Sequence, residues 1–203
     1  MVTDSTSTLL AVAGIITVAS ITPGPNNLLV MRSALTSGVS GALPSIAGVI
    51  LGSLGLLTLI LGGLQSVFES TPMLRSAVVV AGSAYLGWFG LSMLRSSPVV
   101  SEAVTQTVSD SGVGRLMTAT TFQFLNPKSW VLVLSASAAT HTGAVFLRVG
   151  ALLIVIPAIC LTLWSILGVI LMRFLSQERQ RRRFDRGMGI MLMVSATLML
   201  RSV

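Results

Sequence analysis

Residues 20–30 read SITPGPNNLLV, and they interrupt a run that is otherwise apolar. The run reads LLAVAGIITVAS before the interruption and LLVM after it. The interrupting residues are Pro23, Gly24, Pro25, Asn26 and Asn27. Proline has no N–H, and its ring clashes with the carbonyl four residues back, so Pro23 and Pro25 release the carbonyls of Ala19 and Ile21. The residue before each proline is also pushed away from helical geometry. The stretch therefore predicts an unwound turn inside a helix that is long and apolar enough for lipid.

The composition indicates an all-α integral membrane protein. Of 203 residues, 53% are hydrophobic and only 9% are charged, more apolar surface than a soluble domain of this length could bury. The net charge of +7 is not expected to indicate a nucleic-acid partner, because the cations cluster as in a cytoplasmic loop beside the lipid bilayer. Six of the thirteen lie in one connection: Arg173, Arg179, Arg181, Arg182, Arg183 and Arg186.

Six apolar segments follow one another along the chain, at 8–31, 41–66, 73–94, 116–140, 144–172 and 186–202. A helix needs about 20 residues to cross the hydrocarbon core, and the first five segments are long enough. The uninterrupted part of the last, GMGIMLMVSATLML, would span only about 21 Å. It crosses the membrane only if the residues at its ends join the helix.

The longest polar stretch divides the chain into two sets of three segments. Residues 1–95 form the first set, 96–115 a cytoplasmic linker, and 116–203 the second set. The connections after segments one, three and five hold nine cations, against three on the other side. Because cytoplasmic loops carry the excess of cations, both termini are predicted to lie outside.

A second break is predicted in segment 116–140, where Asn126, Pro127 and Lys128 lie near the middle. Pro127 releases the carbonyl of Gln123. Lys128 is about 12 residues, or ~18 Å, from either end of the segment, and a central cation costs at least about 2.5–3.5 kcal/mol. All six acids fall outside the apolar segments. Lys128 therefore needs carbonyls, water or an anion brought by another molecule, unless it is a structural lysine in a tilted helix.

The two broken segments correspond, since each is the first of its set of three. An odd number of crossings makes the second set enter the membrane from the opposite side, which brings the two breaks together at mid-depth. Paired breaks in inverted repeats point to the central site of a transporter. The alternative is a pair of packed kinks whose amides bond to neighbouring helices.

Four stretches in this order resemble the lysine-exporter (LysE/RhtB) family of amino-acid efflux proteins and cover almost the whole chain. They are TPGPNNLLV at 22–30, AGVILGSLG at 47–55, GSAYLGWFGLSMLRS at 82–96 and FLNPKSW at 124–130. The first and last are the specific ones. The resemblance implies six helices, a cytoplasmic (inner) membrane location and export of amino acids. In this family, aspartate often follows the second proline, whereas Asn26 cannot take up a proton, which argues against proton coupling there.

The sequence thus predicts a secondary exporter of amino acids or similar zwitterions, with six transmembrane helices in two inverted repeats. A non-transporting scaffold or an intramembrane enzyme remains the alternative.

We expect Lys128 to meet the carboxylate of the substrate. Asn26, Asn27 and the freed carbonyls are expected to take the ammonium group of the substrate. No catalytic residue, metal or cofactor is expected, and a homo-oligomer is compatible with the sequence. The candidate substrate-binding residues are Pro23, Gly24, Pro25, Asn26, Asn27, Gln123, Asn126, Pro127, Lys128 and Tyr85. Tyr85 could face the site or make an interhelical hydrogen bond.

Overall fold

The computed structural model describes residues 2–95, 111–138, 143–174 and 177–201, and within these ranges the chain is almost entirely helical and has no strand. The helices are α1 (Val2–Ile21), α2 (Pro25–Leu59), the π-helical turn η1 (Ile60–Leu64), α3 (Gln65–Ser70), α4 (Pro72–Arg95), α5 (Gly112–Leu125), α6 (Pro127–Ser137), α7 (Gly143–Phe174) and α8 (Glu178–Leu200). Most of the expected linker, 96–110, lies outside the described residues.

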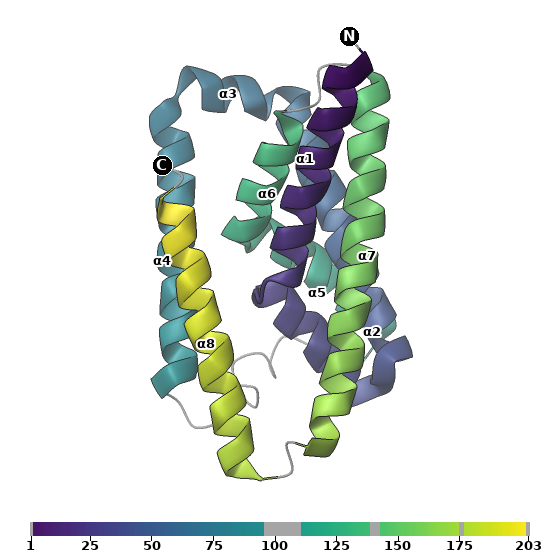
Figure 1. Ribbon diagram of the computed structural model, residues 1–203, viewed down its shortest axis with the longest axis vertical. Coiled ribbons are helices and arrows are strands. Elements are labelled where there is room, and N and C mark those ends of the chain that lie inside the picture. The colour runs from purple at the N-terminus through teal and green to yellow at the C-terminus, as the bar shows by residue number, and fades with distance from the viewer. Residues whose placement is uncertain (1, 96–110, 139–142, 175–176, 202–203) are drawn as a thin grey trace.

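The helices lie roughly along one axis, except for α3, which crosses one end of the molecule (Figure 1). Both termini lie at that same end (Figure 1). The most extensive packing is between α2 and both α7 and α5, and between α4 and α8. The helices that carry the two predicted breaks, α1–α2 and α5–α6, therefore pack together, and α7 packs against α1 and α2.

Helix α2 differs from the expected segments because it joins the end of 8–31 to most of 41–66. The chain reverses within it at Gly38, whose φ of 73° is in the left-handed region that glycine adopts at little cost. The helix after this point ends in η1, where Gly63 has a φ of 132°. The polar link between the first two segments is therefore a turn of one residue rather than a loop.

Helix α8 begins eight residues before the apolar segment 186–202 that the sequence predicts. Its 23 residues span about 35 Å, so the arginine-rich connection supplies the length that the apolar part lacks. Asp185 in this added part is only 3% exposed, and Arg32, also outside the predicted segments, is 7% exposed. Burial of these two charged residues was not predicted, because both lie outside the apolar segments.

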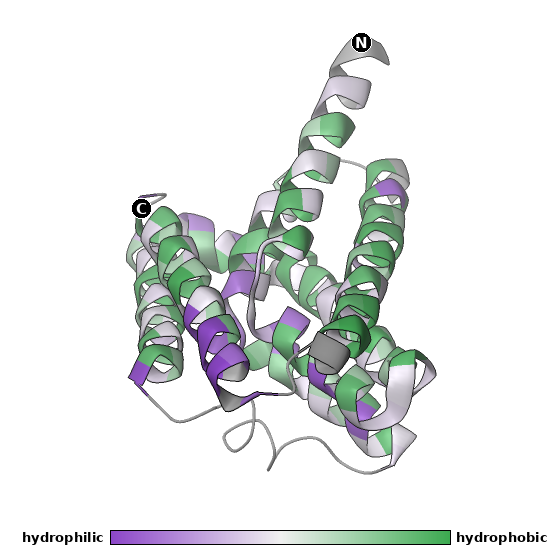
Figure 2. Cartoon of the chain, turned by 60° about the horizontal axis from the view of Figure 1, so that its bottom comes forward, coloured by the Kyte–Doolittle hydropathy of each residue, from purple (hydrophilic) through white to green (hydrophobic). Residues whose placement is uncertain are grey.

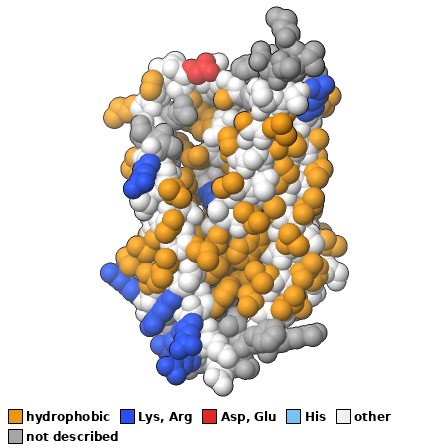
Figure 3. All heavy atoms as spheres, viewed as in Figure 1, with side chains coloured by type: hydrophobic (Ala, Val, Ile, Leu, Met, Phe, Trp, Pro, Cys, Tyr) orange, Lys and Arg blue, Asp and Glu red, His pale blue; other side chains and the backbone are white. Residues whose placement is uncertain are grey.

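The outer surface of the molecule is apolar. Among the described residues, three helical stretches are long and apolar enough to cross a membrane: Pro25–Ser70, Pro72–Arg95 and Val145–Leu171. Hydrophobic residues run along the helices (Figure 2) and cover the side of the molecule, while Lys and Arg gather mostly towards the end opposite the termini (Figure 3). Side chains such as Leu10 and Leu147 are about 70% exposed, which is favourable in lipid but not in water. The chain is a multi-pass α-helical membrane protein.

Two glycines allow the helices that carry the second break to pack closely against their neighbours. A Cβ on Gly52 of α2 would lie 2.6 Å from the Cβ of Gln123, and one on Gly82 of α4 would overlap Pro127. Small residues at helix contacts let backbones approach in this way. The close packing holds Gln123 against α2 and fixes the start of α6.

Candidate functional site

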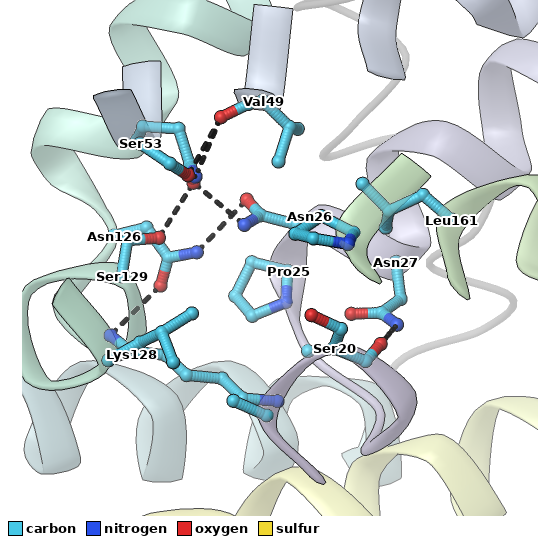
Figure 4. A pocket seen from close by; sticks show the side chains of 15 residues that line it. Ser20, Pro25, Asn26, Asn27, Val49, Ser53, Asn126, Lys128, Ser129 and Leu161 are labelled. Carbon is cyan, nitrogen blue, oxygen red and sulfur yellow. Dashed lines mark hydrogen bonds between the residues drawn. The ribbon is translucent and has the colours of Figure 1, made fainter. Parts of the chain in front are cut away.

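A small cavity lies where the two breaks meet, and its lining comes from α1, α2, α5, α6 and α7 (Figure 4). Its volume of about 30 Å³ is room for about two water molecules. The lining residues are Ala19, Ser20, Gly24, Pro25, Asn26, Asn27, Val49, Ser53, Gln123, Asn126, Lys128, Ser129, Leu132, Pro157 and Leu161. The cavity thus combines backbone, amides, hydroxyls, one ammonium and an apolar wall.

The first break covers the three residues between α1 and α2. Gly24 is extended, with φ −161° and ψ 173°, and precedes Pro25 at the first position of α2, where proline loses no helical hydrogen bond. At the end of α1, the hydroxyl of Thr22 donates to the carbonyl of Val18 at 2.7 Å and lies 3.3 Å from the carbonyl of Ala19. The side-chain amide of Asn27 donates to the carbonyl of Ser20 at 2.7 Å. Side chains therefore satisfy part of the backbone that the prolines release.

The second break is a single residue, Asn126, between α5 and α6. Its side chain accepts from the backbone N–H of Lys128 at 3.1 Å, which caps α6. Its own backbone N–H donates to the carbonyl of Gln123 at 3.3 Å, and the indole N–H of Trp130 donates to the carbonyl of Phe124 at 2.9 Å. The break is thus internally hydrogen-bonded.

Lys128 reaches across from the second break to the first. Its Nζ donates to the carbonyl of Thr22 at 2.8 Å, to the hydroxyl of Thr22 at 2.9 Å and to the carbonyl of Pro23 at 3.4 Å. These carbonyls follow the C-terminal end of α1, where the helix dipole favours a cation. The expectation that the carbonyl of Gln123 is free is therefore corrected, because it accepts from the backbone N–H of Asn126. The carbonyls that meet the cation are those of Thr22 and Pro23.

Gln123 is the centre of a polar network that links the two breaks to α2. Its Nε2 donates to Ser53 Oγ at 2.6 Å and to the carbonyl of Val49 at 3.1 Å. Its Oε1 accepts from Asn26 Nδ2 at 2.7 Å and from Ser129 Oγ at 2.6 Å. All four hydrogen-bonding positions of this amide are used, so the side chain, only 2% exposed, is held in one orientation.

Asn126 adds a direct contact between the breaks, because its Nδ2 donates to Asn26 Oδ1 at 3.0 Å. Asn26 is therefore held by both Gln123 of α5 and Asn126, the residue at the second break itself. Figure 4 shows these amides on the opposite side of Pro25 from Asn27. Asn26 thus belongs to the network that fastens the two breaks together.

The structure brings most of the predicted site residues together. Seven of the ten line the cavity: Gly24, Pro25, Asn26, Asn27, Gln123, Asn126 and Lys128. Pro23 contributes its carbonyl to Lys128, and Pro127 begins α6 against Gly82. Tyr85 does not line the cavity; it packs beside Phe89, with a ring-centroid distance of 6.3 Å, and against the core formed by α2, α4 and α8.

Four polar contributors to the site were not predicted from the sequence: Ser20, Thr22, Ser53 and Ser129. Ser20, Thr22 and Ser129 are within three residues of a break, which could have marked them. Ser53 lies in the apolar run AGVILGSLG, where a lone serine is common in membrane helices, so only the packing of α5 on α2 identifies it.

Lys128 is the only charged residue among those that line the cavity in the described part of the chain. The other polar groups there are amides, hydroxyls and carbonyls, and the remaining wall is apolar. The site therefore carries one positive charge and can offer a favourable contact to one anionic group.

Comparison with known proteins finds relatives over most of the chain. The family described as LysE type translocator matches residues 17–202. The chain is 25% identical to a leucine efflux protein of Enterobacter sp. over 189 residues, which is 90% of each chain. It is 27% identical to a homoserine/homoserine lactone efflux protein of Salmonella typhimurium over 191 residues, covering 90% of this chain and 91% of the relative. No solved structure matches the chain significantly.

Proposed function

The chain belongs to the LysE-type translocators, a family of transporters rather than enzymes, and we propose that it exports amino acids or similar zwitterions across the cytoplasmic membrane. Family membership also argues against the scaffold alternative that the sequence left open. The observation that carries the proposed site is Lys128, a single cation placed where two helix breaks meet.

We propose six membrane crossings arranged as two inverted repeats, 1–95 and 116–203. The pairing of helices supports this arrangement, since each helix of one half packs on its counterpart. The third helix of the first half, α4, packs along the last helix, α8; α2 packs along α7; and the two breaks meet at the cavity. Such pairing is what two repeats related by an axis in the membrane plane would produce.

The proposed orientation places both termini outside the cell. In a Cys160→Ser background, a cysteine at Thr6 in α1 should react with a membrane-impermeant thiol reagent added outside. A cysteine at the exposed Ser37, next to the turn at Gly38, should react only after the membrane is made permeable. The opposite labelling pattern would reverse the orientation, and with it the direction assigned to each broken helix.

In the proposed site, Lys128 binds the substrate carboxylate, and the side-chain oxygen of Asn27 takes the ammonium. The N-terminal ends of α2 and α6 begin at the breaks and add partial positive charge for the carboxylate. The hydrogen bonds of Asn26 with Gln123 and Asn126 hold the two breaks next to each other.

The cavity volume indicates a closed state of the transport cycle. A space for about two water molecules cannot accept an amino acid, so the two breaks must separate towards one side of the membrane for loading. The contacts between Asn26 and both Gln123 and Asn126 cross this boundary. We propose that opening breaks these bonds, while the contacts of Lys128 with Thr22, which also join the two breaks, stay in place.

Transport by the full chain in proteoliposomes tests the function. Vesicles preloaded with radiolabelled leucine or homoserine should lose the label faster than protein-free vesicles, and ATP should make no difference. A preparation that is folded by size-exclusion chromatography yet releases none of a panel of amino acids would contradict the proposed export. Comparing release with and without an imposed gradient separates gradient-driven export from exchange.

A further inference from the structure

Asn27 presents an acceptor to the cavity that no described residue uses. The side chain is 3% exposed, and its Nδ2 is committed to the carbonyl of Ser20 at 2.7 Å. That contact fixes the amide orientation, so Oδ1 faces the other way, towards Gly24. Within the described ranges Oδ1 accepts no hydrogen bond, although it lines the cavity. A buried acceptor in this position favours a ligand that brings a donor.

Gly24 lies between this acceptor and the ammonium of Lys128. A Cβ on Gly24 would lie 3.0 Å from Lys128 Nζ and 3.4 Å from Asn27 Oδ1. The two groups are therefore close enough for one small molecule to contact both, through hydrogen bonds of about 2.8 Å at each end. The backbone at Gly24 is extended, so glycine is needed there for space rather than for its φ angle.

Lys128 can accept this extra partner without losing its firm contacts. Two of its three hydrogen bonds are short, at 2.8 and 2.9 Å to Thr22, while the third, to the carbonyl of Pro23, is 3.4 Å. The third distance is beyond the usual range for an N–H···O bond. A carboxylate can therefore replace the contact with Pro23 and form a charge-assisted bond instead.

We infer that the site selects neutral α-amino acids, in which the carboxylate and the ammonium are on the same carbon, and that they sit over Gly24 between Lys128 and Asn27. The inference rests on the proposed function and adds the substrate class. Greater separation of the two charged groups would move one of them out of reach. A lactone or an amide lacks the carboxylate and loses the contact with Lys128.

The other residues that line the cavity favour a substrate whose side chain is uncharged. The apolar part of the wall is formed by Ala19, Val49, Leu132, Pro157 and Leu161, and apart from Lys128 the polar residues there are uncharged. A cationic side chain would find no carboxylate among the lining residues and would add to the positive charge of Lys128. A second carboxylate would be desolvated against apolar groups without a second cation.

The test compares ligands on detergent-solubilised full-length protein by isothermal titration calorimetry. The ligands are leucine, homoserine, lysine, leucinamide and γ-aminobutyrate. The parent should bind leucine and homoserine, and bind each of the other three at least about tenfold more weakly. Gly24→Ala should weaken leucine binding at least about tenfold, since the added Cβ fills the space between the two groups. Gly14→Ala is the matched control, because a Cβ there has no neighbour within 4 Å.

A second variant keeps the test decisive if Gly24→Ala does not fold. Asn27→Leu removes the acceptor at similar size and should weaken leucine binding by a comparable factor. Export of lysine as readily as leucine by the parent would keep the proposed function and overturn this inference. Unchanged leucine affinity in a folded Gly24→Ala or Asn27→Leu variant would also overturn it. A parent that transports no amino acid would overturn both proposals.

Discussion

Replacement of Lys128 with methionine is expected to lower the affinity for carboxylated substrates about 30-fold or more. Methionine keeps the length of the side chain and removes its charge. Loss of a desolvated charge contact typically costs about 2–5 kcal/mol, and 2 kcal/mol is about 30-fold in affinity. Amino-acid amides, which lack the carboxylate, should bind the parent weakly and be affected little by the substitution. Concentration dependence of transport in proteoliposomes measures the effect for both ligand types.

The same substitution removes the hydrogen bonds from Nζ to Thr22 and Pro23, so folding must be checked separately. Membrane insertion should be at least as efficient as in the parent, because the burial cost of the cation disappears. Arg148→Met is the matched control: it removes one exposed cation from α7 and should leave transport unchanged. Unaltered apparent affinity of Lys128→Met for free amino acids would mean that the lysine only stabilises the break at the end of α1.

Replacement of both Pro23 and Pro25 with alanine should reduce transport at least tenfold while the protein remains inserted. Alanines permit helical hydrogen bonds to the carbonyls of Ala19 and Ile21, so α1 and α2 can join. Conversion of three residues from extended to helical geometry shortens the chain by about 5 Å. Asn26 and Asn27 would then be displaced from Gln123 and Ser20, and loss of even one such contact is about a tenfold effect.

Pro44→Ala is the control for the double substitution, because Pro44 also lies inside a membrane helix, α2, but does not line the cavity. It should insert and transport like the parent. Thermal stability in detergent, measured beside transport, separates loss of the site from loss of the fold. Full transport by an inserted double variant would show that the break is a packing kink without a role in the site.

Helix ends lie at the two proline-containing stretches because proline acts locally. Helices end at Ile21 and Leu125 and restart at Pro25 and Pro127, as the missing N–H groups and ring clashes require. The remaining boundaries depend on effects that hydropathy does not record. Gly38 turns the chain inside what is otherwise one helix, and α8 begins in the arginine-rich connection because helix formation does not require apolar residues.

The contents of the site were predictable in part. The central position of Lys128 and the two asparagines could be identified from their polarity in apolar segments. The partners could not, since they depend on how α5 packs against α2. Only the close approach at Gly52 places Ser53 and Val49 around Gln123. Gln123 was selected for the carbonyl that Pro127 releases, but the structure assigns the larger role to its side chain. Tyr85, selected as a polar-tipped residue within a helix, packs among aromatic rings away from the cavity.

The small volume of the cavity has a consequence for the electrical potential across the membrane. A cation that crosses the membrane down a potential of 100 mV releases about 2.3 kcal/mol, so an open water path would dissipate the potential continuously. Space for about two water molecules is too short for a hydrated file, and the ammonium of Lys128 beside it repels protons and metal cations. We therefore expect the empty protein to conduct no measurable ion current, so that many copies could lie in the membrane without a leak.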